Sequence, residues 1–291
     1  MTLNLTELAS LNYPNTSERY RFFDFVQKPI EMYVFVDPLC PECWSMEPYL
    51  KKLSIEFGRF FTIRPIISNH LRIIDKQKMC MSTKQLNRNL DAKEDRLTYV
   101  DNSIAFFPSV ALAIKAAELQ GNSAGRIFLR KIQENYFLKK ENIYDTEILL
   151  RCAKESNLDI LEFKKDLFSV PAKKAFQGDI KITKEMKVKE TPTIVFFNQV
   201  IEDEGVKISG LNSYDIYVHI LKEMLQRDPL PAEKPPLEDF LEYYGVASIK
   251  EISFVYDWTD AETTKAMIKL QLKRKVKRMP GKDDMFWKYV K

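Results

Sequence analysis

The sequence predicts an α/β fold in which two strand-and-helix halves flank a long helical segment, with a small module after them. Three observations lead to this prediction. An apolar run at 32–36 is followed directly by two cysteines and then by a helical pattern. Residues 68–175 show no strand pattern, and strand patterns return only at 193. The segment 227–236 holds four of the fourteen prolines, which marks it as an extended linker before a C-terminal module.

The composition indicates a helix-rich protein with enough apolar residues for a sizeable core. Of its 291 residues, 45% are hydrophobic and 30% are charged, and only eight are glycine. The net charge of +4 is too small to imply a nucleic-acid or membrane partner by itself. The polar first 15 residues do not match a secretory signal, and no apolar run has the length of a membrane helix. We therefore expect a cytoplasmic protein with reduced thiols and no membrane partner.

The first half of the fold is predicted from short local patterns. Residues 1–21 are polar and are expected to form a flexible lead-in. The short apolar run 32–36 predicts a buried strand, and apolar residues at helical spacing predict a helix over 41–58. The alternating segment 60–67 predicts a second strand, which we expect to end near Pro65.

A helical segment, 68–175, follows the second strand and separates it from the rest of the sheet. It holds helical patterns at 84–97, 108–121, 125–136, 145–156 and 157–168. Beyond it, strand patterns lie at 193–197 and 206–208, and a helix pattern lies at 214–226. We expect these elements to form one domain over 22–226.

Cys40 and Cys43 lie at the junction of the first strand and its helix, which is the thioredoxin-type placement of a redox pair. The positive end of a helix favours a thiolate, so Cys40 is the candidate nucleophile and Cys43, one turn on, can resolve a mixed disulfide. The alternative is half of a zinc site, but no second Cys-x-x-Cys or histidine pair completes it. Cys80 and Cys152 are expected to be ordinary thiols. We expect no metal and no cofactor.

The C-terminal module, 237–291, shows three helical patterns followed by a hairpin pattern, which predicts a small winged-helix-like domain. Ser248 followed by Glu251 is the signature of a capping box at the start of the second helix. The third helix and the hairpin contain a basic stripe, which we define as Lys269, Lys273, Arg274, Lys277 and Arg278.

The basic stripe has three interpretations. In winged-helix DNA-binding modules the corresponding helix enters the major groove, so nucleic-acid binding has to be weighed. The rest of the module is rich in acidic residues, however, and the module as a whole lacks the basic character of a nucleic-acid binder. A solvent-exposed face or contact with an acidic protein surface is therefore favoured, and nucleic acid is not the expected partner.

The order of elements and two motifs make residues 22–226 similar to the DsbA-like branch of the thioredoxin superfamily. The motifs are Cys40-Pro41-Glu42-Cys43 and Thr191-Pro192. The resemblance implies a cis peptide bond at Pro192, beside the redox helix. The sequence departs from strongly oxidising relatives, which carry Pro-His between the cysteines. Because the carboxylate of Glu42 opposes a nearby thiolate, we expect a less oxidising pair here.

The whole chain, with its C-terminal extension, resembles the SpxH (YjbH) family of adapters. The resemblance implies that the protein binds the transcriptional regulator Spx and promotes its degradation by the ClpXP protease. It also implies that the thioredoxin-like domain is a scaffold for protein binding, with no confident catalytic residue. The residues that contact Spx are not identified by the sequence, and the basic stripe is one candidate partner surface.

The main alternative is an enzyme, a cytoplasmic dithiol–disulfide oxidoreductase with Cys40 as nucleophile and Cys43 as resolving thiol. An adapter whose cysteines only modulate binding lies between these two interpretations. A redox-sensing DNA-binding protein is a third possibility, which the acidic residues of the module disfavour.

Overall fold

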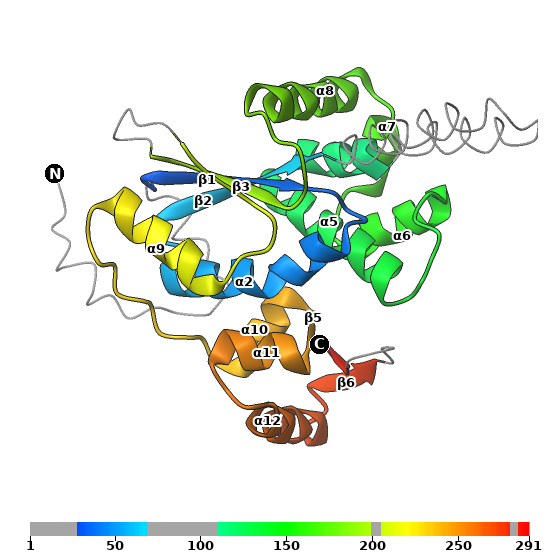
Figure 1. The fold of residues 1–291 in the computed structure, drawn as a ribbon. Helices are drawn as coiled ribbons and strands as arrows, with labels where there is room; N and C mark the ends of the chain where they lie inside the picture. The colour runs from blue at the N-terminus through cyan, green and yellow to red at the C-terminus, as the bar shows by residue number, and fades with distance from the viewer. Residues whose placement is uncertain (1–27, 69–109, 199–204, 280–284, 291) are drawn as a thin grey trace, which may run out of the picture.

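The structure, a computed structural model, describes residues 28–68, 110–198, 205–279 and 285–290 (Figure 1). Its larger sheet has four strands in the order β2-β1-β3-β4. The strands are β1 (Ile30–Val36), β2 (Phe61–Ile67), β3 (Thr193–Asn198) and β4 (Val206–Ser209). β1 is parallel to β2 and antiparallel to β3, and β4 is antiparallel to β3. The four strands predicted over these ranges are therefore present and belong to one sheet.

The strand predicted over 60–67 is present as β2, and it continues to Ile67, two residues beyond the end expected near Pro65. The N–H of Ser68 donates to the Val36 carbonyl at 2.8 Å, so even-numbered residues of β2 face β1. Odd-numbered residues direct their N–H groups to the other side, where the N–H of Ile67 donates to the Asp179 carboxylate at 2.8 Å. Pro65 belongs to this second set, so its missing N–H removes no bond to β1.

Helices cover both faces of the sheet. They are a helix at 110–119, α2 (Pro41–Phe57), α5 (Asn122–Phe137), α6 (Thr146–Glu155), α7 (Ile160–Asp166), α8 (Val170–Glu185) and α9 (Tyr214–Leu225). α2 and α9 lie on one face of the sheet and α8 lies on the other (Figure 1). The expected limit of the helical segment at residue 175 is wrong. The side chain of Ser169 caps the first turn of α8 and Pro171 fits that turn, so a further helix begins there. The helix expected at 84–97 lies outside the described residues.

Alternate residues of β1 pack into cores on opposite faces of the sheet. Ile30, Met32 and Val34 belong to the large core that α2 and α9 help to build. Phe35 points the other way and packs with Val188, which follows α8. This alternation is what the short apolar run at 32–36 predicts for a strand that is buried on both faces.

The C-terminal module has its own core and a second sheet in the order β5-β7-β6. Its elements are α10 (Leu237–Tyr244), β5 (Val246–Ser248), α11 (Ile249–Tyr256), α12 (Asp260–Leu272), β6 (Val276–Met279) and β7 (Phe286–Tyr289). Three helices and a hairpin occur where the patterns predict them, and Ser248 and Glu251 form the expected capping box. The three-residue strand β5 was not expected. The winged-helix-like character of the module stays a prediction.

The module packs on the thioredoxin-like part through α11, which lies against α2 (Figure 1). The proline-rich segment before it has no helix or strand and contacts the C-terminal end of α2, where the N–H of Ala232 donates to the Glu56 carbonyl at 2.8 Å. The hydroxyl of Tyr256 donates to the Pro235 carbonyl at 2.8 Å. No helix among the described residues is long and apolar enough to cross a membrane.

Candidate functional site

Cys40 is the N-cap residue of α2, at the point where the chain leaves β1 and turns into the helix. Its backbone is extended, with φ −83° and ψ 120°, and Pro41 occupies the first helical position, which proline favours. The turn before it is held by Asp37, which is buried. The Asp37 carbonyl accepts from the Cys40 N–H at 3.0 Å, and its carboxylate accepts from the Leu39 N–H at 2.9 Å. The thiol is therefore placed at the positive end of α2 by local interactions.

The environment of the Cys40 sulfur stabilises a thiolate. The pKa of Cys40 is lowered to about 6, chiefly because the thiol of Cys43 donates a hydrogen bond to it. The N–H of Cys43 also reaches the Cys40 sulfur, at 3.4 Å. Cys43 itself is buried, and its pKa is raised because its proton is held by Cys40 and because burial disfavours its charge. The pair therefore has one half-buried, reactive sulfur and one protonated, buried sulfur.

Glu42 affects Cys40 differently from what we expected. Its backbone N–H stabilises the Cys40 thiolate and lowers the pKa, while its side chain is exposed to solvent. The pKa of Cys40 is lowered first by the Cys43 thiol and then by the backbone N–H groups of Cys43 and Glu42, and the Glu42 carboxylate is not among the causes. The resulting redox potential of the pair stays a prediction.

The loop before β3 lies against this sulfur. The Thr191–Pro192 peptide bond is cis, as the resemblance implies, and Pro192 is buried. The Cys40 thiol donates to the Thr191 carbonyl at 3.6 Å, across 151 residues of sequence. The N–H of Gly210 donates to the Pro192 carbonyl at 2.8 Å, which ties the loop to the end of β4. The fold thus brings together the two motifs that were singled out in the sequence.

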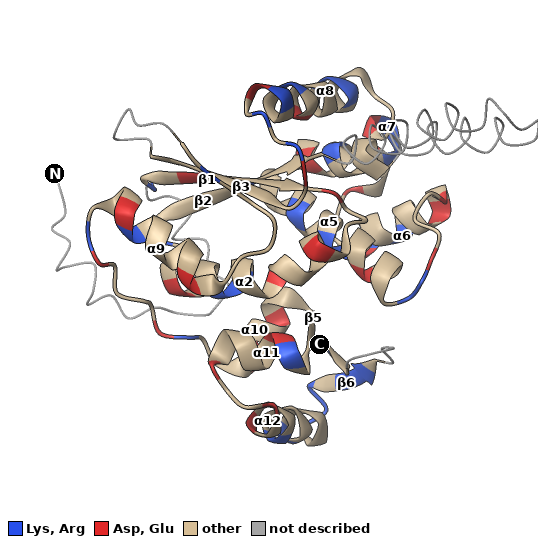
Figure 2. Cartoon of the chain, viewed as in Figure 1, with Lys and Arg blue, Asp and Glu red and all other residues tan. Residues whose placement is uncertain are grey.

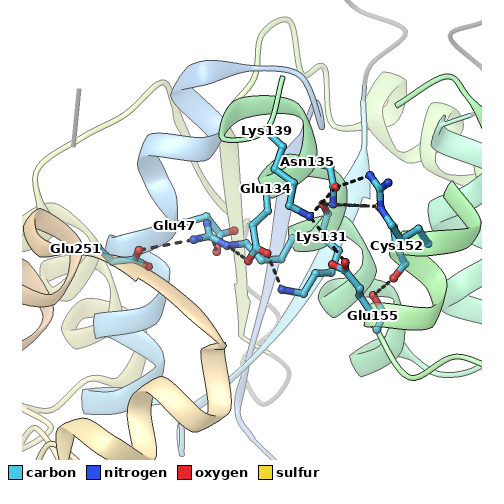
Figure 3. A network of polar contacts seen from close by, with 11 residues as sticks. Glu47, Lys131, Glu134, Asn135, Lys139, Cys152, Glu155 and Glu251 are labelled. Atoms are coloured by element: carbon cyan, nitrogen blue, oxygen red, sulfur yellow. Dashed lines mark hydrogen bonds and ion pairs between the residues drawn. The ribbon is translucent and has the colours of Figure 1, made fainter. Parts of the chain in front are cut away.

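A group of largely buried charges joins α2, α5 and α11, and Figure 3 shows its carboxylates Glu47, Glu134 and Glu251. We call it the charged seam and define it as Glu47, Lys51, Arg130, Glu134 and Glu251. Lys51 pairs with Glu251, and both side chains are about 95% buried, being 4% and 5% exposed. The Arg130 guanidinium lies 3.5 Å from Glu134, 3.6 Å from Glu251 and 3.7 Å from Glu47. The seam therefore holds charges from both parts of the chain in mutual contact.

Burial and charge compete at Glu251 and at Lys51. Burial by itself raises the pKa of Glu251, but the positive charges of Lys51 and Arg130 outweigh it and the pKa is lowered. Burial and the nearby Arg130 lower the pKa of Lys51 in spite of Glu251. Removing one member of such a buried pair leaves the other without compensation, which is strongly unfavourable.

The seam also reaches the cysteine pair. Trp44 follows Cys43 directly, and the guanidinium carbon of Arg130 lies 3.9 Å from the centroid of the Trp44 ring. This stacking of a cation on an aromatic face is favourable, and more so when both groups are shielded from water. Arg130 thus contacts the residue next to the cysteine pair and Glu251 of the C-terminal module at the same time.

A second, more exposed set of contacts involves Lys52 and Glu56 of α2. Lys52 and Lys234 both pair with Asp257, which is 62% exposed. The Tyr214 phenol donates to the Glu56 carboxylate at 2.5 Å, which connects α9 to α2. This set fastens the proline-rich segment and the end of α11 to α2 at the edge of the interface.

The sequence was compared with known proteins. The family model described as Thioredoxin matches residues 33–219. The ClpXP adapter protein SpxH of Bacillus subtilis is 47% identical over 268 residues, which covers 90% of each chain. The chain belongs to the SpxH family. The protein of the same name from Bacillus licheniformis is 43% identical and covers 94% of each chain. Among solved structures, the oxidoreductase DsbA from Xylella fastidiosa is 14% identical with a TM-score of 0.47, covering 70% of this chain and 90% of its own.

The SpxH family assignment agrees with the predicted thioredoxin-like α/β fold.

The basic stripe is not part of the cysteine site. Lys269 lies in the last turn of α12, Lys273 and Arg274 in the following turn, and Lys277 and Arg278 on β6. α12 packs on α11 on the side away from α2 (Figure 1). The stripe and the cysteine pair are therefore two separate surfaces of this SpxH-family chain.

Cys152 has no part in the cysteine site of this SpxH-family member. Cys152 is buried and accepts a hydrogen bond from the Asn135 amide at 3.2 Å. Burial raises the pKa of Cys152 to about 12, which makes it an inert thiol at neutral pH. Cys80 lies outside the described residues.

Sequence reasoning missed the charged seam. The local signal was the pair Lys51-Lys52 in a helix that was predicted to bury one face. Two adjacent lysines in such a helix are usually interpreted as part of its solvent-exposed side. Glu251, the partner of Lys51, is 200 residues away. Its capping-box role explained its presence at the start of α11, so nothing local indicated a second role.

Proposed function

We propose that this protein is an adapter that binds Spx and promotes the degradation of Spx by ClpXP. The observation that supports this most strongly is the identity of 40–47% to relatives named ClpXP adapter protein SpxH, over 90% or more of this chain. The alignment with the Bacillus licheniformis relative covers 94% of this chain, so it has to include most of the C-terminal module. The proposal carries with it the cytoplasmic location that the sequence predicts.

The architecture suits an adapter, because an adapter needs binding surfaces held in a constant relation rather than a turnover site. The charged seam joins the module to α2 through side chains that are almost fully buried. The proline-rich segment is itself held to α2 by a hydrogen bond and an ion pair, so it is not a freely moving linker. Two surfaces, one at Cys40 and one on the module, therefore keep a defined separation.

A reconstituted degradation assay tests the proposal. Spx is incubated with ClpXP and ATP, with and without the protein, and the loss of Spx is followed on gels. We expect faster loss of Spx with the protein present and unchanged loss of a ClpXP substrate unrelated to Spx. The variant Cys40→Ala/Cys43→Ala should retain this activity, because a scaffold does not need the thiols. No acceleration by the folded wild-type protein would contradict the adapter function.

The second candidate function is a dithiol–disulfide oxidoreductase, and the lowered pKa of Cys40 favours it. The Cys40 thiolate would attack a substrate disulfide, forming a mixed disulfide and releasing one substrate thiolate. Cys43 would then lose its proton and attack Cys40, which releases the second substrate thiol. The substrate gains two electrons and the Cys40–Cys43 pair is oxidised, so an external thiol reductant has to restore it.

Insulin reduction with dithiothreitol as the reductant separates the two functions. Turnover by the wild-type protein that is lost in Cys40→Ala, combined with no effect on Spx, would favour the enzyme. Spx degradation that survives in the double cysteine variant, with insulin reduction at the level of dithiothreitol alone, would favour the adapter.

A further inference from the structure

The outward face of α12 is an unusual mixture of apolar and basic side chains. The inward face of this helix is buried through Thr263, Met267 and Leu270. On the opposite side Ile268 is 47% exposed and Leu272 is 80% exposed. These two residues are four apart, so they lie one above the other on the helix surface. The two side chains form a small apolar strip on the outward face of α12.

Basic side chains surround the two apolar residues. An open hollow of about 580 Å³ runs beside Ile268 and is lined by Asp260, Ala261, Thr264, Lys265, Ile268 and Lys269. Beyond Leu272 the basic stripe continues through Lys273 and Arg274 onto β6. Figure 2 shows basic residues on α12 and β6, at the side of the module remote from the larger sheet.

Most of these cations have no acidic partner within the described residues. The neighbouring Lys275 forms an ion pair with Glu238 at 2.9 Å. Among the described residues, Lys265, Lys269 and Lys273 form no such pair. Arg278 is occupied differently, because it lies 5.5 Å from the ring centroid of Trp287 and packs on Met285. The lysines around Ile268 and Leu272 are therefore available to an external acidic group.

The same face disfavours a nucleic acid. When a helix reads the major groove, the residues at its N-terminal end approach the bases. Here that end carries Asp260 and Glu262, whose carboxylates would be repelled by the phosphates. The C-terminal half of the face carries Ile268 and Leu272, whose apolar side chains have no partner on a phosphate backbone.

We propose that the outward face of α12 binds an acidic amphipathic helix of a protein partner. Apolar residues of that helix would cover Ile268 and Leu272, and its acidic residues would pair with Lys265, Lys269 and Lys273. This is the helix-in-groove mode of recognition, with charge complementarity determining the partner's orientation. The proposal goes beyond the adapter function and rests on the α12 face alone.

The test uses the full-length protein and a fluorescent synthetic peptide. The peptide is an amphipathic helix with leucines at i, i+4 and i+7 and glutamates beside them, and its binding is measured by fluorescence anisotropy. We expect saturable binding that weakens as salt is added, because the lysines are exposed. The variants Ile268→Gln/Leu272→Gln and Lys269→Glu/Lys273→Glu should each weaken binding at least tenfold. A peptide with lysine in place of glutamate should not bind.

A matched control makes the same kinds of change on another exposed helix. Leu161 on α7 is 79% exposed and Lys165 lies one turn away, so Leu161→Gln/Lys165→Glu should leave the peptide affinity unchanged. Circular dichroism and thermal unfolding of every variant show that the module remains folded. Binding of purified Spx is measured on the same samples, so failure of the adapter function is recognised separately from failure of this proposal.

Three results would overturn the proposal. The first is no peptide binding up to about 1 mM, which corresponds to negligible specific affinity. The second is equal peptide binding by the wild-type protein and both α12 variants. The third is the absence of peptide binding together with tight binding of duplex DNA that the α12 variants abolish, which would assign the face to nucleic acid. Self-association in sedimentation that the α12 variants abolish, again without peptide binding, would assign the face to a second copy of the chain.

Discussion

Arg130 lies over the ring of Trp44 at 3.9 Å, while the same guanidinium faces Glu251 of the C-terminal module at 3.6 Å. One side chain therefore contacts the helix turn that carries the cysteine pair and the first turn of α11. Glu251 in turn caps α11 and pairs with Lys51. The junction between the two parts of the chain thus depends on a few buried charges, and its energetics can be tested residue by residue.

Replacing Glu251 with glutamine should lower the free energy of unfolding by about 3–5 kcal/mol, the usual cost of removing one partner of a buried pair. Lys51 and Arg130 would remain buried without the carboxylate that compensates them. Urea unfolding followed by tryptophan fluorescence and circular dichroism measures the change.

Glu262→Gln is the matched control for this substitution. Glu251 and Glu262 both occupy the third position of a capping box, and glutamine can also fill that role. Glu262 is exposed, so its replacement should cost much less than that of Glu251. Equal losses would mean that the capping box, and not the charged seam, accounts for the effect.

The charged seam should weaken in acid. Although burial alone raises the pKa of Glu251, Lys51 and Arg130 hold it below its usual range. A carboxyl group with a lowered pKa stabilises the fold above its unfolded pKa, about 4.3, and this stability is lost as the pH falls through the folded value. The stability advantage of the wild-type protein over Glu251→Gln should therefore shrink below about pH 4.

The measurement is the difference in urea midpoint between these two proteins from pH 3 to pH 7. Burial raises the pKa values of Glu118 and Asp179, so their protonation favours the folded state and acts in the opposite direction. Taking the difference removes this common contribution. A difference that does not change with pH would contradict the assignment to Glu251.

Alkylation of Cys40 by iodoacetamide should show a midpoint near pH 6, since the thiolate is the reacting form and the pKa is lowered to about 6. Cys43→Ala should raise this midpoint because the hydrogen bond from Cys43 is the largest cause of the shift. Cys43→Ser keeps a donor and should raise it less. Mass spectrometry gives the rates, with buried Cys152 as the unreactive control. A midpoint near that of an ordinary thiol, about 8.5, would disprove the activation.

Asp257→Asn should cost about 1 kcal/mol or less, even though Lys52 and Lys234 both pair with Asp257. The side chain is 62% exposed, so water and salt screen these pairs. Asparagine tolerates the left-handed backbone at this position, φ 55°, and should keep the end of α11 intact. Urea unfolding checks the value, and a loss as large as that of Glu251→Gln would mean that the outer contacts support the interface as strongly as the seam.

Several features were predictable because their signals are local. The helix start at Cys40 and the capping box of Ser248 and Glu251 depend on residues within one turn of each other. The strand at 32–36 was recognised from an apolar run that is buried on both faces. The end of the helical segment was missed because the second half of α8 carries Gly178 and the β-branched residues Ile180, Ile182 and Thr183, which weaken the helical pattern that Ser169 and Pro171 begin.

Local patterns in the sequence were enough to predict the four strands of the larger sheet, the place of the cysteine pair at the start of α2 and the family to which the chain belongs. Only the tertiary structure decided that Lys51 is buried against Glu251, that Arg130 lies between Trp44 and the module, and which side of α12 faces outward. The physical reason is that a lysine on a helix has the same local pattern whether it meets water or a carboxylate. Its partner is selected by the packing of α11 on α2, which joins residues 200 positions apart.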